Sequence, residues 1–105
     1  MAGAGFATLW SFSIDPARRA EFEAAYGPAG RWVELFRRAP GYVGTELLQD
    51  RAAPDRYFTI DRWESAEAFA AFRRDHGTEY ERLDREFEGL TTREAPVGEF
   101  RPLAK

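Results

Sequence analysis

The sequence has no cysteine and only one histidine, His76, among its 105 residues. The absence of cysteine excludes disulfides, thiolate metal sites and a cysteine nucleophile. A single histidine excludes a metal site built from several histidines of one chain. We therefore predict that the protein holds no metal.

Long apolar runs and an excess of positive charge are also missing. No stretch approaches the roughly 18 apolar residues of a membrane-spanning helix, and the start, MAGAGFATLW, lacks the basic residues of a signal peptide. The net charge is −3, whereas nucleic-acid binding requires a concentrated basic face. We expect a cytoplasmic protein whose partners are neither membranes nor nucleic acids.

What the sequence does have is aromatic residues: nine Phe, four Tyr and three Trp, 15% of the chain. Each ring needs a surface to pack on, which can be the core, a subunit interface or a ligand. The hydrophobic share of 44% and the charged share of 31% are ordinary for a globular protein. The length suits a single domain over residues 1–105, with a core at about 6–100.

Alternating polarity predicts strands at 6–14, 42–50 and 56–64 and within 91–100. The turn-rich RAAPD between the middle two strands favours an antiparallel hairpin. Pro96 indicates a bulge or an edge position in the last strand. Two sets of residues should each share one face: Phe6, Thr8, Trp10, Phe12 and Ile14, and Tyr57, Thr59, Asp61 and Trp63.

The segments between these strands show helix signals. Asp15 followed by Pro16 is a helix start, Ser65 is a second N-cap, and YGPAG at 26–30 breaks the first helix. Gly77 is expected to end the second helix, and Thr78 with Glu81 reads as a capping box that opens another. The resulting βαββαβ order is the α+β ferredoxin-like unit, an antiparallel sheet with helices on one face. The other face also carries apolar residues, which predicts a homodimer.

Two segments, GRWVELFRRAPGYVGTELLQD (30–50) and RYFTIDRWESAEAFAAF (56–72), resemble the antibiotic biosynthesis monooxygenase (ABM) domain of the dimeric α/β-barrel superfamily. The likeness extends from Phe6 to Phe100. It implies that two sheets face each other as a barrel, with a pocket between each sheet and its helices. Cofactor-free members oxidise polycyclic phenols such as anthrones: the substrate is deprotonated and its anion reacts with oxygen. The resemblance thus implies that no cofactor is bound.

A related branch of the superfamily degrades haem with an Asn on the first strand, a Trp on the second helix and a downstream His. The corresponding positions hold Trp10, Phe72 and, approximately, Asp84. None of the three matches, so the sequence does not favour haem degradation.

Two side chains are candidate bases. His76 has an ordinary pKa near neutral pH, but at a helix C-terminus it can simply complement the helix dipole. Asp61 shares a strand face with Tyr57 and Trp63, where burial would raise its pKa and make it a proton acceptor. The alternative for Asp61 is a salt bridge to an Arg across the sheet or the subunit interface.

The candidate substrate-binding residues are aromatic, and each has core packing as its alternative: Trp10, Trp32, Phe36, Tyr57, Trp63, Phe69, Phe72 and Tyr80. A wall of such rings favours a flat, small aromatic molecule as ligand. The sequence therefore predicts a cofactor-independent monooxygenase that oxidises a polycyclic aromatic or quinol-type substrate. Two other functions stay open: a non-catalytic protein that binds small aromatic ligands, and an assembly module whose rings serve only packing.

Overall fold

The computed structural model describes residues 4–103, so both ends of the predicted 1–105 domain lie outside the described residues. Its elements, in chain order, are β1 (Phe6–Ile14), the 3₁₀ turn η1 (Pro16–Arg18), α1 (Arg19–Tyr26), α2 (Arg31–Phe36), β2 (Tyr42–Gln49), β3 (Arg56–Trp63), α3 (Ala66–Asp75), α4 (Gly77–Phe87), the 3₁₀ turn η2 (Glu88–Leu90) and β4 (Thr91–Phe100). The predicted βαββαβ order is confirmed, and each helical connection is broken in two.

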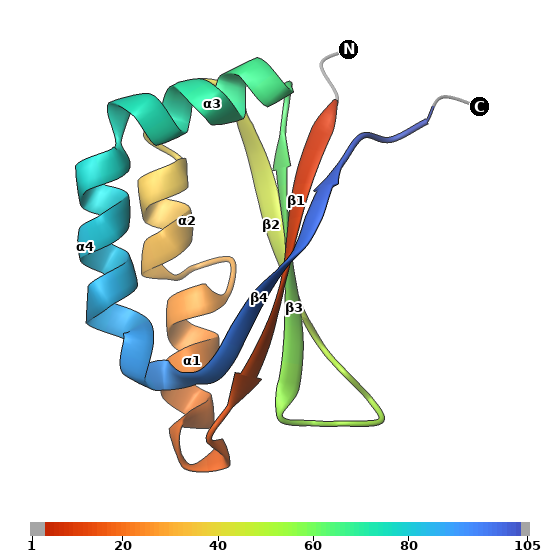
Figure 1. Cartoon of the computed structure of the whole chain (residues 1–105), viewed down its shortest axis with the longest axis vertical. Coiled ribbons are helices and arrows are strands. Elements are labelled where there is room, and N and C mark those ends of the chain that lie inside the picture. The colour runs from red at the N-terminus through yellow and green to blue at the C-terminus, as the bar shows by residue number, and fades with distance from the viewer. Residues whose placement is uncertain (1–3, 104–105) are drawn as a thin grey trace.

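The four strands form one antiparallel sheet in the order β2-β3-β1-β4 (Figure 1). The predicted hairpin is confirmed, since β2 pairs directly with β3. The strand β4 lies at an edge, and its pairing with β1 shifts between Leu9, opposite Gly98, and Trp10, opposite Pro96. Both expectations for Pro96, a bulge and an edge strand, are therefore met, because proline cannot donate to a sheet ladder.

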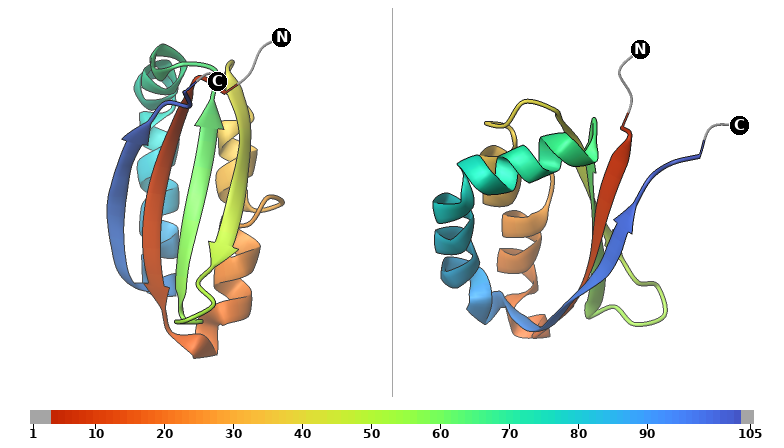
Figure 2. Two further views of the ribbon diagram at one scale, coloured as in Figure 1. Left: turned by 90° about the vertical axis from the view of Figure 1, so that its right-hand side faces the viewer. Right: turned by 45° about the horizontal axis from the view of Figure 1, so that its top comes forward.

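All helices lie on one face of the sheet, and the other face is open (Figures 1 and 2). The face under the helices, here called the inner face, carries the residues that the alternation predicted. In β1 it holds Phe6, Thr8, Phe12 and Ile14, which are buried, and Trp10, which is half-buried; in β3 it holds Tyr57, Thr59, Asp61 and Trp63, all buried. Phe22 of α1 and Phe72 of α3 pack onto this face.

Two of the three predicted helix starts have the expected side-chain caps. Asp15 Oδ1 accepts a hydrogen bond from the Ala17 amide at 2.9 Å, and Ser65 Oγ accepts one from the Ala68 amide at 3.0 Å. The capping box at Thr78 is wrong: Gly77 begins α4 instead of ending α3, and Thr78 already lies in the first turn. The His76 amide donates to the Phe72 carbonyl at 2.8 Å and the His76 carbonyl accepts from Tyr80 at 2.9 Å, so backbone bonds alone make the junction.

The loop before β2 requires a glycine at position 41. Gly41 has φ +91°, a left-handed conformation, and a Cβ there would approach the Ala68 Cβ to 2.6 Å. The Gly41 carbonyl accepts a hydrogen bond from the Glu64 amide at 2.7 Å. This close packing against the start of α3 determines where Tyr42 enters the sheet.

The open face of the sheet, here called the outer face, is largely apolar at its centre. Leu48, opposite Phe58, and Phe100, opposite Ala7, lie on this face and are 44% and 46% exposed. Leu9, Phe58 and Ile60 lie between them on the two central strands and are half-buried. None of the described helices is both long and apolar enough to cross a membrane.

Candidate functional site

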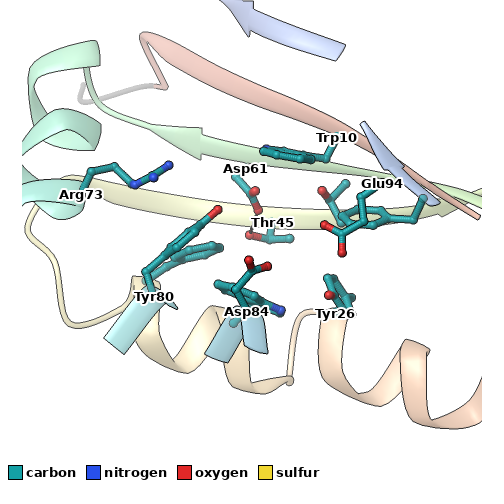
Figure 3. Close-up of a pocket in the computed structure, with 12 residues that line it drawn as sticks. Trp10, Tyr26, Thr45, Asp61, Arg73, Tyr80, Asp84 and Glu94 are labelled. Carbon is teal, nitrogen blue, oxygen red and sulfur yellow. Dashed lines mark hydrogen bonds between the residues drawn. The ribbon is translucent and has the colours of Figure 1, made fainter. Parts of the chain in front are cut away.

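A cavity of about 220 Å³ lies between the inner face of the sheet and the helices (Figure 3). Twelve residues line it: Trp10, Phe12, Tyr26, Trp32, Phe36, Thr45, Thr59, Asp61, Arg73, Tyr80, Asp84 and Glu94. They come from all four strands and all four α-helices. The site therefore exists only once the whole fold has assembled.

Aromatic rings form most of the cavity wall. Tyr26 ends α1 and Trp32 lies at the start of α2, and the break between the two helices brings their ring centroids to 6.1 Å. Tyr80 of α4 meets Trp32 edge to face at 5.0 Å. On the sheet side, Trp10 stacks beside Phe12 at 6.5 Å. Rings in such varied orientations offer flat and edge-on contacts to an aromatic ligand.

Asp61 is the one buried carboxylate of this wall, since its residue is only 9% exposed. It lies on β3 directly opposite Thr8 of β1 and Thr45 of β2. The Thr45 hydroxyl donates to Asp61 Oδ1 at 2.7 Å. Burial raises the pKa of Asp61 to about 6, against the hydroxyls of Thr45 and Thr8, which lower it. At neutral pH Asp61 is therefore mostly ionised and able to accept a proton.

Three further charged residues surround the opening of the cavity and are exposed: Arg73 of α3, Asp84 of α4 and Glu94 of β4. The carboxyl groups of Asp84 and Glu94 point into the space between sheet and helices (Figure 3). Burial and the charge of Asp84 raise the pKa of Glu94, while a hydrogen bond from Thr91 at 3.0 Å lowers it. Two acids against one cation make the opening negatively charged.

The two phenols of the cavity are hydrogen-bond donors at neutral pH. Burial is the main cause that raises the pKa of both Tyr26 and Tyr80, and the charges of Asp84 and Glu94 raise it further. Both side chains thus keep their protons over the physiological range. A bound oxygen atom of a ligand can accept from either hydroxyl.

The structure separates the candidate residues into two groups. Five of them line the cavity: Trp10, Trp32, Phe36, Asp61 and Tyr80. Trp63, Phe69 and Phe72 instead pack on one another behind Phe36, with centroid distances of 5.2–6.5 Å. Tyr57 lies in the core at the other end, where its hydroxyl donates to Glu23 at 2.5 Å and accepts from Arg19 at 2.7 Å. None of these four rings lines the cavity.

His76 is not among the residues that line the cavity. Its ring stacks on Phe72 with a centroid distance of 5.6 Å, and its Nδ1 lies 3.7 Å from Glu79 Oε2. It is both the C-cap of α3 and the N-cap of α4, so a positive charge there would be favoured by one helix dipole and opposed by the other. Packing against Phe72 outside the cavity favours a structural role for His76, and Asp61 is the candidate base that lines the cavity.

Several cavity residues carried weaker sequence signals. Phe12 and Thr59 follow from the strand alternation, and Asp84 is one helical turn after Tyr80, on the same stripe of α4. Thr45 and Glu94 were harder to find, because their directions depend on bulges in β2 and β4 that break the alternation. Arg73 is followed by Arg74, and such a pair on a helix is typical of a solvated face.

Solved structures with the same fold cover nearly all of the chain. The cofactor-independent oxygenase SnoaB from Streptomyces nogalater matches with a TM-score of 0.76 and 24% identity, over 98% of this chain and 97% of that one. A putative antibiotic biosynthesis monooxygenase from Bordetella bronchiseptica matches with a TM-score of 0.72 and 20% identity, over 97% and 100% of the two chains. At these identities the likeness shows the fold.

A sequence relative with a curated description is a mycobilin-producing heme oxygenase from Mycobacterium tuberculosis. It is 38% identical over 55 residues, which covers 43% of this chain and 52% of the relative. The chain thus spans about half the length of the curated relatives that it matches. The model of the antibiotic biosynthesis monooxygenase family matches residues 6–82, most of the chain. With the fold and this match in agreement, the chain belongs to the antibiotic biosynthesis monooxygenase family.

Proposed function

We propose that this protein is a cofactor-independent monooxygenase that oxidises a neutral polycyclic aromatic or quinol-type small molecule with O₂. The observation that carries the proposal is the position of Asp61, a buried carboxylate with its pKa raised to about 6 on the wall of an aromatic-lined cavity. A general base works best when its pKa lies near the operating pH. Membership of the family supports the same reaction class.

In this mechanism the rings of Trp10, Trp32 and Tyr80 hold the flat substrate beside Asp61, which accepts an acidic proton from it. The electron-rich anion then reduces O₂. For a substrate oxidised from CH₂ to C=O, one oxygen atom enters the substrate and the other leaves as water with the two hydrogens. The phenols of Tyr26 and Tyr80 can donate hydrogen bonds to the oxygen anion that develops.

The cavity favours a small ligand. Its volume of about 220 Å³ lies below the roughly 300 Å³ at which typical drug-sized pockets begin. A few fused rings are therefore a better match than a large glycosylated aromatic. An open cavity with polar groups also supports a ligand-binding function over an assembly module, for which the rings would fill the space.

Haem is a poor match to the same residues. Axial haem ligands are His, Cys, Met or a tyrosinate, and none of the first three types lines the cavity. The two tyrosines, Tyr26 and Tyr80, have raised pKa values and so resist forming the phenolate that would bind iron. Asp61, Asp84 and Glu94 would also repel the haem propionates. We therefore derive no step through haem, although a curated relative is a heme oxygenase.

The test is oxygen uptake by metal-free protein offered a panel of anthrones and hydroquinones, with the same panel lacking protein as the control for autoxidation. Protein-dependent uptake with stoichiometric product supports the monooxygenase. Binding of the panel without any uptake above the control would reject the reaction and leave the second candidate, a non-catalytic protein for small aromatic ligands. The same cavity supports that candidate as well, because an aromatic-lined cavity can bind a ligand without converting it.

The charges at the opening predict selection against anionic ligands. Transfer of a proton from a neutral substrate to Asp61 leaves the total charge of the cavity unchanged, whereas an anionic substrate adds a further negative charge near Asp84 and Glu94. We expect 2-naphthoate to bind at least about tenfold more weakly than 2-naphthalenemethanol at pH 7, a difference of about 1.4 kcal/mol. Calorimetric titration of both ligands measures the ratio.

The matched variants for this ratio are Asp84→Asn and Glu94→Gln, each of which removes one charge and keeps the side-chain shape. Both variants should reduce the difference in affinity between the two ligands. Added salt should do the same, because salt screens exposed charges. Equal binding of the two ligands by the unmodified protein would contradict the prediction.

We further propose that two copies of the chain pair through the outer face as a homodimer. The support is that the apolar side chains of this face are left uncovered by the described part of the chain and that family resemblance predicts two facing sheets. Exposed apolar patches of this kind mark interaction surfaces. The cytoplasmic location remains a prediction from the sequence.

A further inference from the structure

Two hydroxyl groups stand in line behind the Asp61 carboxylate. The Tyr42 hydroxyl lies 2.7 Å from Thr45 Oγ1, and Thr45 Oγ1 lies 2.7 Å from Asp61 Oδ1. An ionised carboxylate can only accept, so the single hydroxyl hydrogen of Thr45 points to Asp61. Tyr42 must then be the donor to Thr45. Both hydroxyl hydrogens are therefore directed toward Asp61.

A bulge in β2 makes this line possible. Residues three apart on a regular strand face opposite sides of the sheet. The pairing of β2 with β3 shifts between Tyr42, opposite Trp63, and Gly44, opposite Arg62. The extra residue, Val43, lets Tyr42 and Thr45 lie on the same face, as bulges commonly do when they re-aim a side chain.

Tyr42, the residue of this line that is farthest from Asp61, is held by packing and does not line the cavity. The Tyr42 ring meets Trp63 edge to face at 5.3 Å and lies 5.6 Å from Phe36. Gly41, with its left-handed backbone, determines where this ring enters. Tyr42 therefore supports the cavity wall from behind and leaves the ligand space to Asp61 and Thr45.

We propose that Thr45 and Tyr42 are positioning residues that hold the Asp61 carboxylate ionised and in one orientation toward the ligand. This inference rests on the proposed role of Asp61 as the base. Neither hydroxyl takes a direct part in the chemistry. Their effect passes through Asp61, so it should appear in the titration of that carboxyl whether or not a substrate is present.

Other ionisable groups face the same cavity and stay unchanged in the test: Tyr26 of α1, Arg73 of α3, Tyr80 and Asp84 of α4, and Glu94 of β4. A change in the titration of Asp61 then reports the hydroxyl that was removed. The loss of a hydrogen bond to the charged form of an acid raises its pKa.

The experiment follows the Asp61 carboxyl carbon by NMR between pH 4 and 9 in the full chain. We expect Thr45→Val to raise the pKa of Asp61 by roughly one unit, because hydrogen bonds to charged groups are among the stronger ones. Thr45→Ser, which keeps the hydroxyl, should restore the original titration. Tyr42→Phe should also raise the pKa of Asp61, but by less. Thr92→Val, at an exposed position of β4, is the control for replacing a threonine by valine.

Activity gives a second readout that separates this inference from the proposed function. In Thr45→Val the acid limb of the pH profile of kcat/KM should shift to higher pH by the same amount as the NMR titration of Asp61. At high pH the kcat/KM of the variant should return to that of the original protein. A folded Thr45→Val protein that titrates like the original would overturn the positioning role even if turnover is found. An unshifted Tyr42→Phe would overturn the part of Tyr42. Shifts in the expected order without any oxygen uptake would uphold the positioning and reject only the reaction.

Discussion

Replacement of Asp61 by Asn is expected to abolish most turnover and, at the same time, to make the protein more stable at neutral pH. Loss of a general base typically costs about 10²- to 10⁴-fold in rate. Asn keeps the shape of Asp and can still accept from Thr45, but it carries no charge into the cavity wall. A function-specific residue is thus predicted to oppose stability, as is common at active sites.

The stability effect has a defined pH range. Burial raises the pKa of Asp61 from 3.8 to about 6, so the folded state binds the proton more tightly than the unfolded state does. The contribution of Asp61 to stability is therefore full below pH 4 and is lost as the pH rises through 6. At pH 7 the loss is about 2–3 kcal/mol, at about 1.4 kcal/mol per pKa unit.

Urea unfolding of the original protein and of Asp61→Asn at pH 4 and pH 7 measures this difference. The variant should gain stability at pH 7 and little at pH 4. Asp75→Asn, an exposed acid at the end of α3, is the matched control and should change neither activity nor stability by much. If Asp61→Asn were less stable than the original protein at pH 7, the ionised carboxylate would be stabilising the fold, which would contradict the prediction.

Replacement of Ile60 by Lys is expected to convert a dimer into a monomer. Ile60 lies on the central strand β3, pointing to the outer face between Leu9 and Glu46 of the neighbouring strands. In a dimer that covers the outer face, the new ammonium group would be removed from water, which is costly. Loss of a central apolar contact of this kind commonly costs about 2 kcal/mol or more, equivalent to a weakening of at least about thirtyfold.

Light scattering at micromolar concentration separates the two states, because a dimer has twice the 12.0 kDa mass of the chain. Ala70→Lys adds the same charge on the exposed side of α3, and this control variant should keep the solution mass of a dimer. The Ile60→Lys variant should stay folded, since Ile60 contributes to the outer face and not to the core. A mass of one chain for the original protein would already contradict the proposed homodimer.

The strands were predictable because their signal is local. In β1 and β3 every second residue is buried except Trp10, which is half-buried, so the sequence shows the inner face directly. The caps at Asp15 and Ser65 act within three residues and could be identified for the same reason. The junction at His76 was missed because two backbone hydrogen bonds make it, and these leave no mark in the side chains.

The site was only partly predictable, because cavity and core draw on the same residue types. Trp10 and Trp63 both lie on the inner face of the sheet, yet Trp10 lines the cavity and Trp63 is fully buried. The difference depends on how the broken helices cover the sheet. Asp84 and Glu94 come together from α4 and β4, and no sequence spacing relates them.

By itself, the sequence determined the order and phase of the strands, the main helix starts and Asp61 as a carboxylate on an aromatic face, since these follow from short-range periodicity and capping. The tertiary structure decided the rest: which rings surround an open cavity, the place of His76 outside it, and the line of hydroxyls from Tyr42 to Asp61. Those features need contacts between distant segments and a bulge that reverses a side chain, and neither is encoded in local pattern.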